Sequence, residues 1–112
     1  MSTAANRPKA KFVRIWRGRT RREVADAYQA YWLAQGTRPL VERGAIGVRM
    51  LRDDRGDTSA FMTISYWPSL EAMTGGRGGD PLAAHHLARD AEFLMELPER
   101  VEILTIVDST DE

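Results

Sequence analysis

The chain has 112 residues and no cysteine, and its 16 lysines and arginines balance 16 aspartates and glutamates. This length suits one domain with a single core, and the lack of cysteine excludes disulfides and thiolate metal sites. No apolar run approaches the ~18 residues that a membrane span needs. We therefore expect a cytoplasmic protein with no membrane partner and no secretory leader.

Basic residues are concentrated near the N-terminus, where eight of the first 22 residues are lysine or arginine and none is acidic. They are spread over an expected arm, a strand and the start of a helix, so they do not define one groove for a nucleic acid. We expect a solvated or intersubunit charge patch and no nucleic-acid partner.

The chain begins with residues 1–10, whose lack of periodicity predicts a flexible arm. A single domain is expected to follow over 11–112. Alternation of apolar residues predicts its first strand over 11–18, with Arg14 and Trp16 on one face of that strand.

A helix is predicted next, over 20–36. Thr20 and Glu23 have the spacing of a capping box at its start, and Gly36 suits the left-handed position after its last turn. Its expected apolar stripe consists of Val24, Ala27, Tyr28 and Tyr31.

The middle of the chain predicts a short helical turn over 37–44 and then two alternating strands over 45–52 and 58–67. The connection "DDRGD" contains Gly56 and acidic residues that suit a hairpin loop. A short helix is expected to begin at Pro68 or Ser69.

The last part of the chain opens with "GGRGG", which predicts a flexible connection because it lacks the neighbours of a phosphate-binding loop. Asp80 and Pro81 then form a helix-start signal, so we predict a helix over 82–97. The run 101–108 predicts a fourth strand.

The order β-α-β-β-α-β predicts a ferredoxin-like α+β fold, in which a four-stranded antiparallel sheet carries its helices on one face. Apolar side chains point both ways on the third and fourth strands, so the uncovered face would expose a large apolar patch. A second copy of the sheet would bury this patch, and we expect a homodimer through the sheet face.

Three stretches carry a resemblance to a known family: "FVRIWRGRT", "FMTISYWPSLEAM" and "AEFLMELPERVEILTIV". In the second stretch a strand ends in Trp67, and Ser69 and Ala72 follow at the spacing that recurs in that family. Over about residues 11–108 the chain resembles antibiotic biosynthesis monooxygenase-like proteins of the dimeric α/β-barrel superfamily.

The resemblance implies candidate substrate-binding residues. In polyketide-oxidising members, which use no cofactor, the Trp that ends the third strand lines a cavity with two polar residues; the matching positions here are Trp67, Thr63 and Met73. Haem-degrading relatives carry the motif D-x-x-x-A-A-H, which "DPLAAHH" resembles, with His85 or His86 at the axial position. Haem is therefore an alternative to the cofactor-free chemistry.

Both histidines lie within the predicted last helix. Consecutive helical residues are separated by about 100°, so His85 and His86 cannot both face one substrate. His85 falls on the polar side, whereas His86 borders the apolar stripe, with Asp90 four residues further on to orient its ring. We take His86 as a candidate proton acceptor, with a surface position as the alternative, and we expect no metal site.

The candidate cavity follows from the strands. Arg14 and Trp16 share one face, as do Thr63, Ser65 and Trp67; beneath helices these side chains would line a small-molecule site. Tyr28, Tyr31 and Trp32 would form its roof. In the alternative, Trp16 and Trp67 are core residues, and Arg14 reaches solvent or an acid across the dimer. The candidate substrate-binding residues are Trp16, Tyr31, Thr63, Trp67 and Met73, and the candidate catalytic residues are Arg14, which would stabilise an anion, and His86.

Two functions fit these residues. The first is cofactor-independent oxidation of an aromatic or polyphenolic molecule, in which the deprotonated substrate supplies the electrons. The second is a non-catalytic dimeric module that binds a small aromatic or hydrophobic ligand, or whose cavity is filled by side chains. A haem-binding or haem-degrading protein is a third alternative.

Overall fold

A computed structural model describes residues 9–110 of the chain. Residues 1–8 of the predicted arm lie outside this range. The four strands form one antiparallel sheet in the order β2-β3-β1-β4, so the predicted ferredoxin-like α+β fold is confirmed. The strands are β1 (Phe12–Arg21), β2 (Gly47–Arg55), β3 (Thr58–Trp67) and β4 (Glu102–Thr105).

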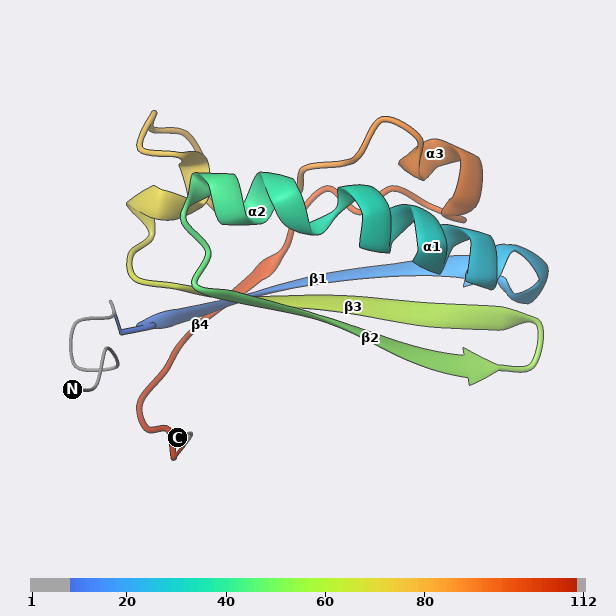
Figure 1. Ribbon diagram of the computed structural model, residues 1–112, viewed down its shortest axis with the longest axis horizontal. Coiled ribbons are helices and arrows are strands. Elements are labelled where there is room, and N and C mark those ends of the chain that lie inside the picture. The colour runs from blue at the N-terminus through green and yellow to red at the C-terminus, as the bar shows by residue number, and fades with distance from the viewer. Residues whose placement is uncertain (1–8, 111–112) are drawn as a thin grey trace.

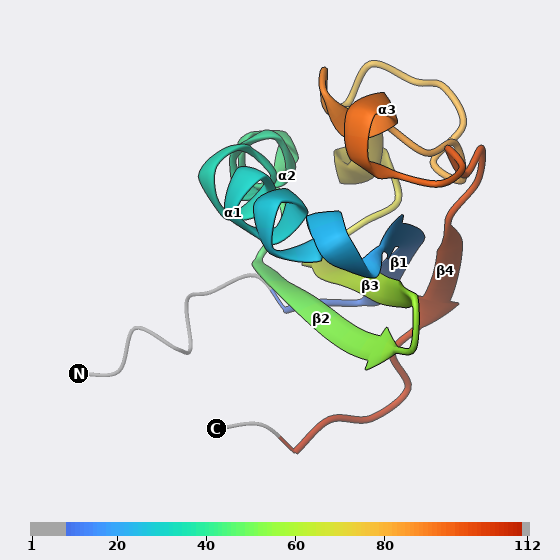
Figure 2. The ribbon, with the colours of Figure 1, turned by 90° about the vertical axis from the view of Figure 1, so that its right-hand side faces the viewer.

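The helices of residues 9–110 all lie on one face of the sheet, and no part of this range forms a layer over the opposite face (Figures 1 and 2). Within the described residues, no helix is long and apolar enough to cross a bilayer. The helical elements are η2 (Arg22–Val24), α1 (Ala25–Gln35), α2 (Thr37–Arg43), η3 (Glu71–Thr74) and α3 (Asp90–Phe93).

The register of β1 against β3 decides which side chains face the helices. Arg14 pairs with Ser65 and Trp16 pairs with Thr63, and all four are buried. Since side chains alternate along a strand, the shared face predicted for these residues is the one beneath the helices. Two core clusters form there: one around Trp16, Tyr28, Trp32 and Phe61, and a second made of Leu40, Trp67 and Met73.

The start of α1 differs from the prediction. Thr20 is still part of β1, where it pairs with Ser59, and its hydroxyl donates to the carbonyl of Arg21 instead of capping a helix. The helix begins at Ala25 after a short 3-10 turn. The predicted stripe is also wrong at Ala27, which is exposed.

Gly36 does not take the predicted left-handed conformation. Its φ of −81° and ψ of −34° are right-handed helical values, so α1 leads directly into α2 (Figure 1). Glycine is needed here for space, because a β-carbon at this position would lie 2.6 Å from the indole ring of Trp32. The left-handed residue is Gly44, with a φ of 116°, which ends α2.

The predicted helix over 82–97 is wrong, and only α3 is helical in that range. The side chain of Asp80 accepts the backbone N–H of Leu82 in an isolated turn. Ala84 then donates to the carbonyl of Glu99, and Val101 donates to that of Leu82. These bonds use backbone groups that a helix would need, so the segment runs extended beside the approach to β4.

We predict that Gly36→Ala lowers the free energy of unfolding by about 1–3 kcal/mol, because the added methyl group collides with Trp32 in a packed core. Urea unfolding followed by circular dichroism measures the change. In a Trp32→Leu background the penalty should disappear. Helix propensity alone predicts the opposite sign, a gain of up to about 1 kcal/mol, and such a gain in the wild-type background would contradict the steric explanation.

Candidate functional site

A pocket of about 130 Å³ lies between the sheet and the helices, where the two core clusters meet. Its floor consists of Arg14, Trp16 and Thr63 from β1 and β3. Its roof consists of Tyr28, Trp32, Gly36, Pro39, Leu40 and Arg43 from α1 and α2. Its side consists of His85, His86, Leu87 and Asp90.

The roof follows helical spacing across the junction of α1 and α2. Trp32, Gly36, Leu40 and Arg43 recur at intervals of three and four residues, which places them on one side of a helical surface. The right-handed conformation of Gly36 makes this surface continuous. Arg43 is a site residue that the sequence analysis does not identify, although this spacing is its signal.

Arg14 brings a buried positive charge to the floor. It is only 4% exposed, and its Nη2 donates a long, 3.4 Å bond to the carbonyl of Ala83. Burial, and then the charge of Arg43, lower the pKa of Arg14 to about 10, so the guanidinium stays charged at neutral pH. No carboxylate of the described residues pairs with it, which leaves its charge available to an anion.

Arg43 adds a second cation from the opposite wall. Its Nε atom is buried without a hydrogen-bond partner among the described residues, and burial lowers the pKa of this guanidinium. Two unneutralised arginines around one pocket create a positive potential, so the site favours negatively charged molecules.

Asp90 is the acidic group of the pocket. Its Oδ2 accepts the backbone N–H of Leu87 at 2.8 Å, which holds the carboxylate at the start of α3. The Oδ1 atom is buried without a partner among the described residues. Burial raises the pKa of this carboxyl, because the charged form loses solvation.

Both histidines line the pocket, contrary to the prediction that at most one could face it. That prediction depends on a helix, and the segment that carries His85 and His86 is irregular. Both residues are exposed to solvent, as expected for His85 and as the surface alternative for His86 predicts, so they stand at the mouth of the pocket. The Nδ1 atom of His86 lies 3.7 Å from Oδ2 of Asp90, which is too long for a hydrogen bond.

His85 has the more perturbed environment of the two. Burial, then the charges of Arg43, Arg14 and His86, lower its pKa from the ordinary value of 6.5. At neutral pH the imidazole is therefore uncharged and can accept a proton.

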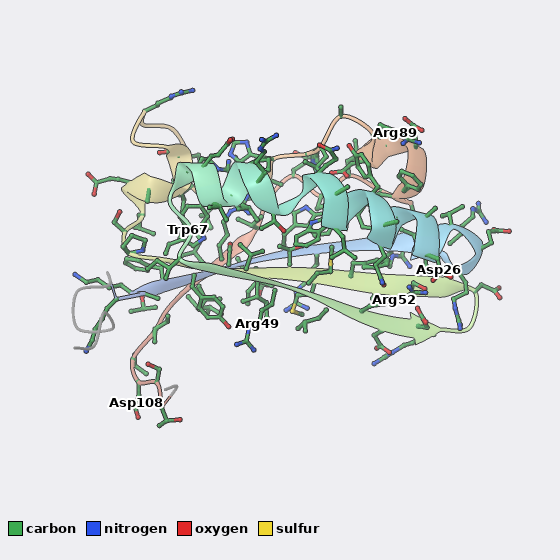
Figure 3. The ribbon with its side chains drawn as sticks, viewed as in Figure 1. Asp26, Arg49, Arg52, Trp67, Arg89 and Asp108 are labelled. Carbon is green, nitrogen blue, oxygen red and sulfur yellow. The ribbon has the colours of Figure 1, made fainter. Side chains whose placement is uncertain are left out.

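Three of the predicted substrate-binding residues lie outside the pocket lining. Trp67 and Met73 are fully buried in the second core cluster, where Trp67 Nε1 donates to Ser65 Oγ at 2.8 Å. Figure 3 shows Trp67 between the sheet and α2. The hydroxyl of Tyr31 accepts the backbone N–H of Arg89 at 3.0 Å, and its ring stacks on Phe93.

A larger hollow of about 630 Å³ lies at the β2–β3 hairpin end of the sheet, near Arg19, Arg52 and Arg55. Its arginines are already neutralised: Arg19 pairs with Glu96 at 2.7 Å, and Arg52 pairs with Asp26 at 2.8 Å (Figure 3). We therefore place the candidate site at the smaller pocket, where Arg14 and Arg43 have no carboxylate partner among the described residues.

Neither a metal nor haem fits this site. Nowhere in the described chain do three His, Cys, Asp or Glu side chains gather as metal ligands would. A haem axial ligand could come from His86, whose side chain is partly exposed. The pocket of about 130 Å³, however, is smaller than an ordinary ligand site of about 300–1,000 Å³ and cannot enclose a tetrapyrrole.

The geometry defines a ferredoxin-like α+β domain with a small cationic pocket between sheet and helices. Searches with the sequence give no matching family model and no significant match among curated proteins. Solved structures do match, over nearly the whole chain. The fold is that of antibiotic biosynthesis monooxygenase-like proteins, as the sequence motifs predict.

Three of these structures illustrate the likeness. A candidate antibiotic biosynthesis monooxygenase from Bacillus cereus has a TM-score of 0.62 at 10% identity, covering 93% of this chain and all of its own. A protein of unknown function from Nitrosomonas europaea has a TM-score of 0.60 at 14% identity, and the match covers 95% of this chain and 98% of that protein. A Streptomyces coelicolor monooxygenase, solved with nanaomycin D, has 0.51 at 21%, covering 96% of each chain. At identities this low, the structural likeness shows a shared fold and nothing more.

We predict that His85 titrates below pH 6.5 and that Arg43→Met moves its pKa upward, because removing a nearby cation favours the imidazolium. Proton NMR of the imidazole resonances, followed against pH, measures the pKa of His85 in the wild-type protein and in Arg43→Met. Arg38→Met is the matched control, since Arg38 is an exposed residue of α2 paired with Glu42. An ordinary His85 pKa in the wild-type protein, or an equal shift in the control, would contradict the described electrostatics.

Proposed function

We propose that this protein binds a small phenol-like molecule in the pocket beneath α1 and α2 and oxidises it with molecular oxygen, without a cofactor. The observation that carries the proposal is Arg14: a buried guanidinium with no carboxylate partner, beside the aromatic rings of Trp16 and Tyr28. A phenolate needs a positive charge and an aromatic surface, and the pocket offers both. The structural likeness to monooxygenases supports this choice.

The reaction needs no electrons from outside. Once deprotonated, the phenolate ring reacts with O2; one oxygen atom enters the product as a new carbonyl and the other leaves as water. A phenol thereby becomes a quinone, and the substrate loses the four electrons that O2 gains. The protein must accept the phenolic proton and stabilise the anion in a site with little water.

The proposed roles follow from position. Arg14 stabilises the phenolate, and Trp16 and Thr63 line its floor. The candidate proton acceptor predicted from the sequence is His86. We add His85 as a second candidate, because burial and the neighbouring cations lower its pKa. Tyr31, Trp67 and Met73 support the surrounding core without reaching the pocket.

Arg14→Met tests the enzyme proposal. We expect the variant to lose at least ten-fold in kcat/KM on any phenol that the wild type oxidises, measured as O2 consumption with product spectra. Its free energy of unfolding should be unchanged or about 1–4 kcal/mol higher, because an apolar side chain of similar volume replaces a buried charge. Turnover that survives unchanged in a folded Arg14→Met variant would overturn the assignment of Arg14.

We also propose that two copies pack through the open sheet face. Adjacent rows of apolar side chains lie on this face: Val13, Ile15, Ile64 and Tyr66. Leu104, at the edge of the face, is 54% exposed. Figure 3 shows Arg49 on the same side, away from the helices. The apolar rows of this face, with Arg49 beside them, can pack against the same rows of a second copy under two-fold symmetry.

Ile64→Lys should convert the dimer to a folded monomer, because it places a charge at the centre of the proposed interface. Light scattering after size exclusion measures the mass. Leu33→Lys is the control, since Leu33 is an exposed residue of α1, and it should leave the dimer intact. A wild-type monomer at micromolar concentration would refute the interface.

A non-catalytic binding module is the second candidate function. The observation that favours it is the 3.7 Å separation of His86 from Asp90, which leaves the predicted proton acceptor without an orienting hydrogen bond. Saturable binding of phenols without O2 consumption would select this function.

A further inference from the structure

In the described part of the chain, the buried side-chain nitrogen and oxygen atoms that lack a hydrogen-bond partner lie around the pocket. Within residues 9–110, the buried side-chain atoms without hydrogen-bond partners are Trp16 Nε1, Arg43 Nε and Asp90 Oδ1, and each belongs to a lining residue. Arg14 adds a guanidinium with one long bond to a carbonyl. Because about nine in ten buried polar groups are normally paired, this concentration indicates a ligand that pairs with them.

The chemistry of these atoms specifies what the ligand must offer. Arginine and the tryptophan N–H can only donate hydrogen bonds. Arg14, Arg43 and Trp16 therefore require an acceptor, and the two positive charges require it to be anionic. The planar guanidinium matches the two oxygens of a carboxylate. Asp90, when ionised, can only accept, so the ligand must also carry a hydroxyl or N–H donor.

The volume of the pocket limits the size of the ligand. A cavity of about 150 Å³ holds a benzene molecule, and this pocket measures about 130 Å³. By this comparison, one aromatic ring is the upper limit for the space between the sheet and α2, with its substituents reaching toward the polar side chains of the lining. Fused ring systems exceed that limit. Trp16, Tyr28 and Trp32 supply aromatic surface around it.

We infer that the pocket binds a single-ring aromatic carboxylate that carries a hydroxyl group. Its carboxylate pairs with Arg14, Arg43 and Trp16 Nε1, and its hydroxyl donates to Asp90. This inference rests on the proposed function for the location of the site. It deepens that function by naming the substrate class, and it reassigns Arg14 from the phenolate oxygen to the carboxylate, so that the hydroxyl faces Asp90. It replaces the polyphenol predicted from the sequence with a smaller acid.

The experiment titrates the full chain with 4-hydroxybenzoate and measures affinity by isothermal titration calorimetry. Two matched probes separate the contributions: 4-hydroxybenzamide lacks the charge, and benzoate lacks the hydroxyl. Each is expected to bind about ten-fold or more weakly than 4-hydroxybenzoate, since a hydrogen bond to a charged group is worth about 1.5–3 kcal/mol and about 1.4 kcal/mol is ten-fold.

Variants identify the residues that hold the carboxylate. Arg14→Met and Arg43→Met should each weaken 4-hydroxybenzoate binding by about ten- to a hundred-fold and remove the preference for the acid over the amide. Arg38→Met, on the exposed side of α2, should bind like the wild type. Circular dichroism confirms that each variant is folded.

A second measurement, the pKa of His85, tests whether the carboxylate of the ligand lies between Arg14 and Arg43. A carboxylate between Arg14 and Arg43 offsets the cations that lower the pKa of His85, so saturating ligand should raise the NMR-measured pKa of His85. The groups that face this ring are Arg14, Arg43 and His86. Binding elsewhere on the molecule would leave the His85 titration unchanged.

The outcomes separate this inference from the enzyme proposal. Tight, arginine-dependent binding without O2 consumption would support the inferred ligand class and refute the proposed oxidation. Oxidation of uncharged phenols by the wild-type protein as fast as oxidation of 4-hydroxybenzoate would support the enzyme proposal and refute the ligand class. Equal affinity for the acid and the amide, equal losses in Arg43→Met and Arg38→Met, or no binding at millimolar 4-hydroxybenzoate would each overturn the inference.

Discussion

The register between β1 and β3 decides what the pocket contains. It places Arg14 opposite Ser65 and Trp16 opposite Thr63, with their side chains on the face that the helices cover. A slip of one residue would turn every side chain of β1 to the other face. Ile15 would then replace the guanidinium beneath the helices, and the pocket would have no charge on its floor. The candidate chemistry therefore depends on one strand pairing.

This arrangement has an energetic cost that the fold must offset elsewhere. Arg14 and Arg43 are desolvated near one another, and no carboxylate of the described residues neutralises them. A buried unpaired charge costs several kcal/mol. The offset comes from the surrounding core, where Trp67, Phe61 and Tyr28 are almost completely buried. At Arg14 the desolvation that lowers the stability of the fold is also the feature on which the proposed anion binding depends.

Local patterns predict the sheet well and the wall of the pocket poorly. The third strand has its predicted bounds, because alternation is a property of the strand itself. Asp80 is a good helix-start signal, but residues 82–84 pair with 99–101 instead of continuing into a helix. That pairing joins segments distant in the chain, which no local pattern reveals. Arg43 lies on a helical stripe that becomes visible only when α1 and α2 form one surface.

The composition of the pocket also explains why a shared fold does not identify the substrate. The floor and roof of the pocket are regular elements of a fold that this chain shares with the solved structures, at TM-scores of 0.51–0.62. The charge of the pocket comes from the side chains of Arg14 and Arg43, which the backbone does not dictate. Its side wall is irregular, held by single bonds such as that from Leu87 to Asp90. One fold can therefore keep the cavity in place while a few side chains decide which ligand enters it.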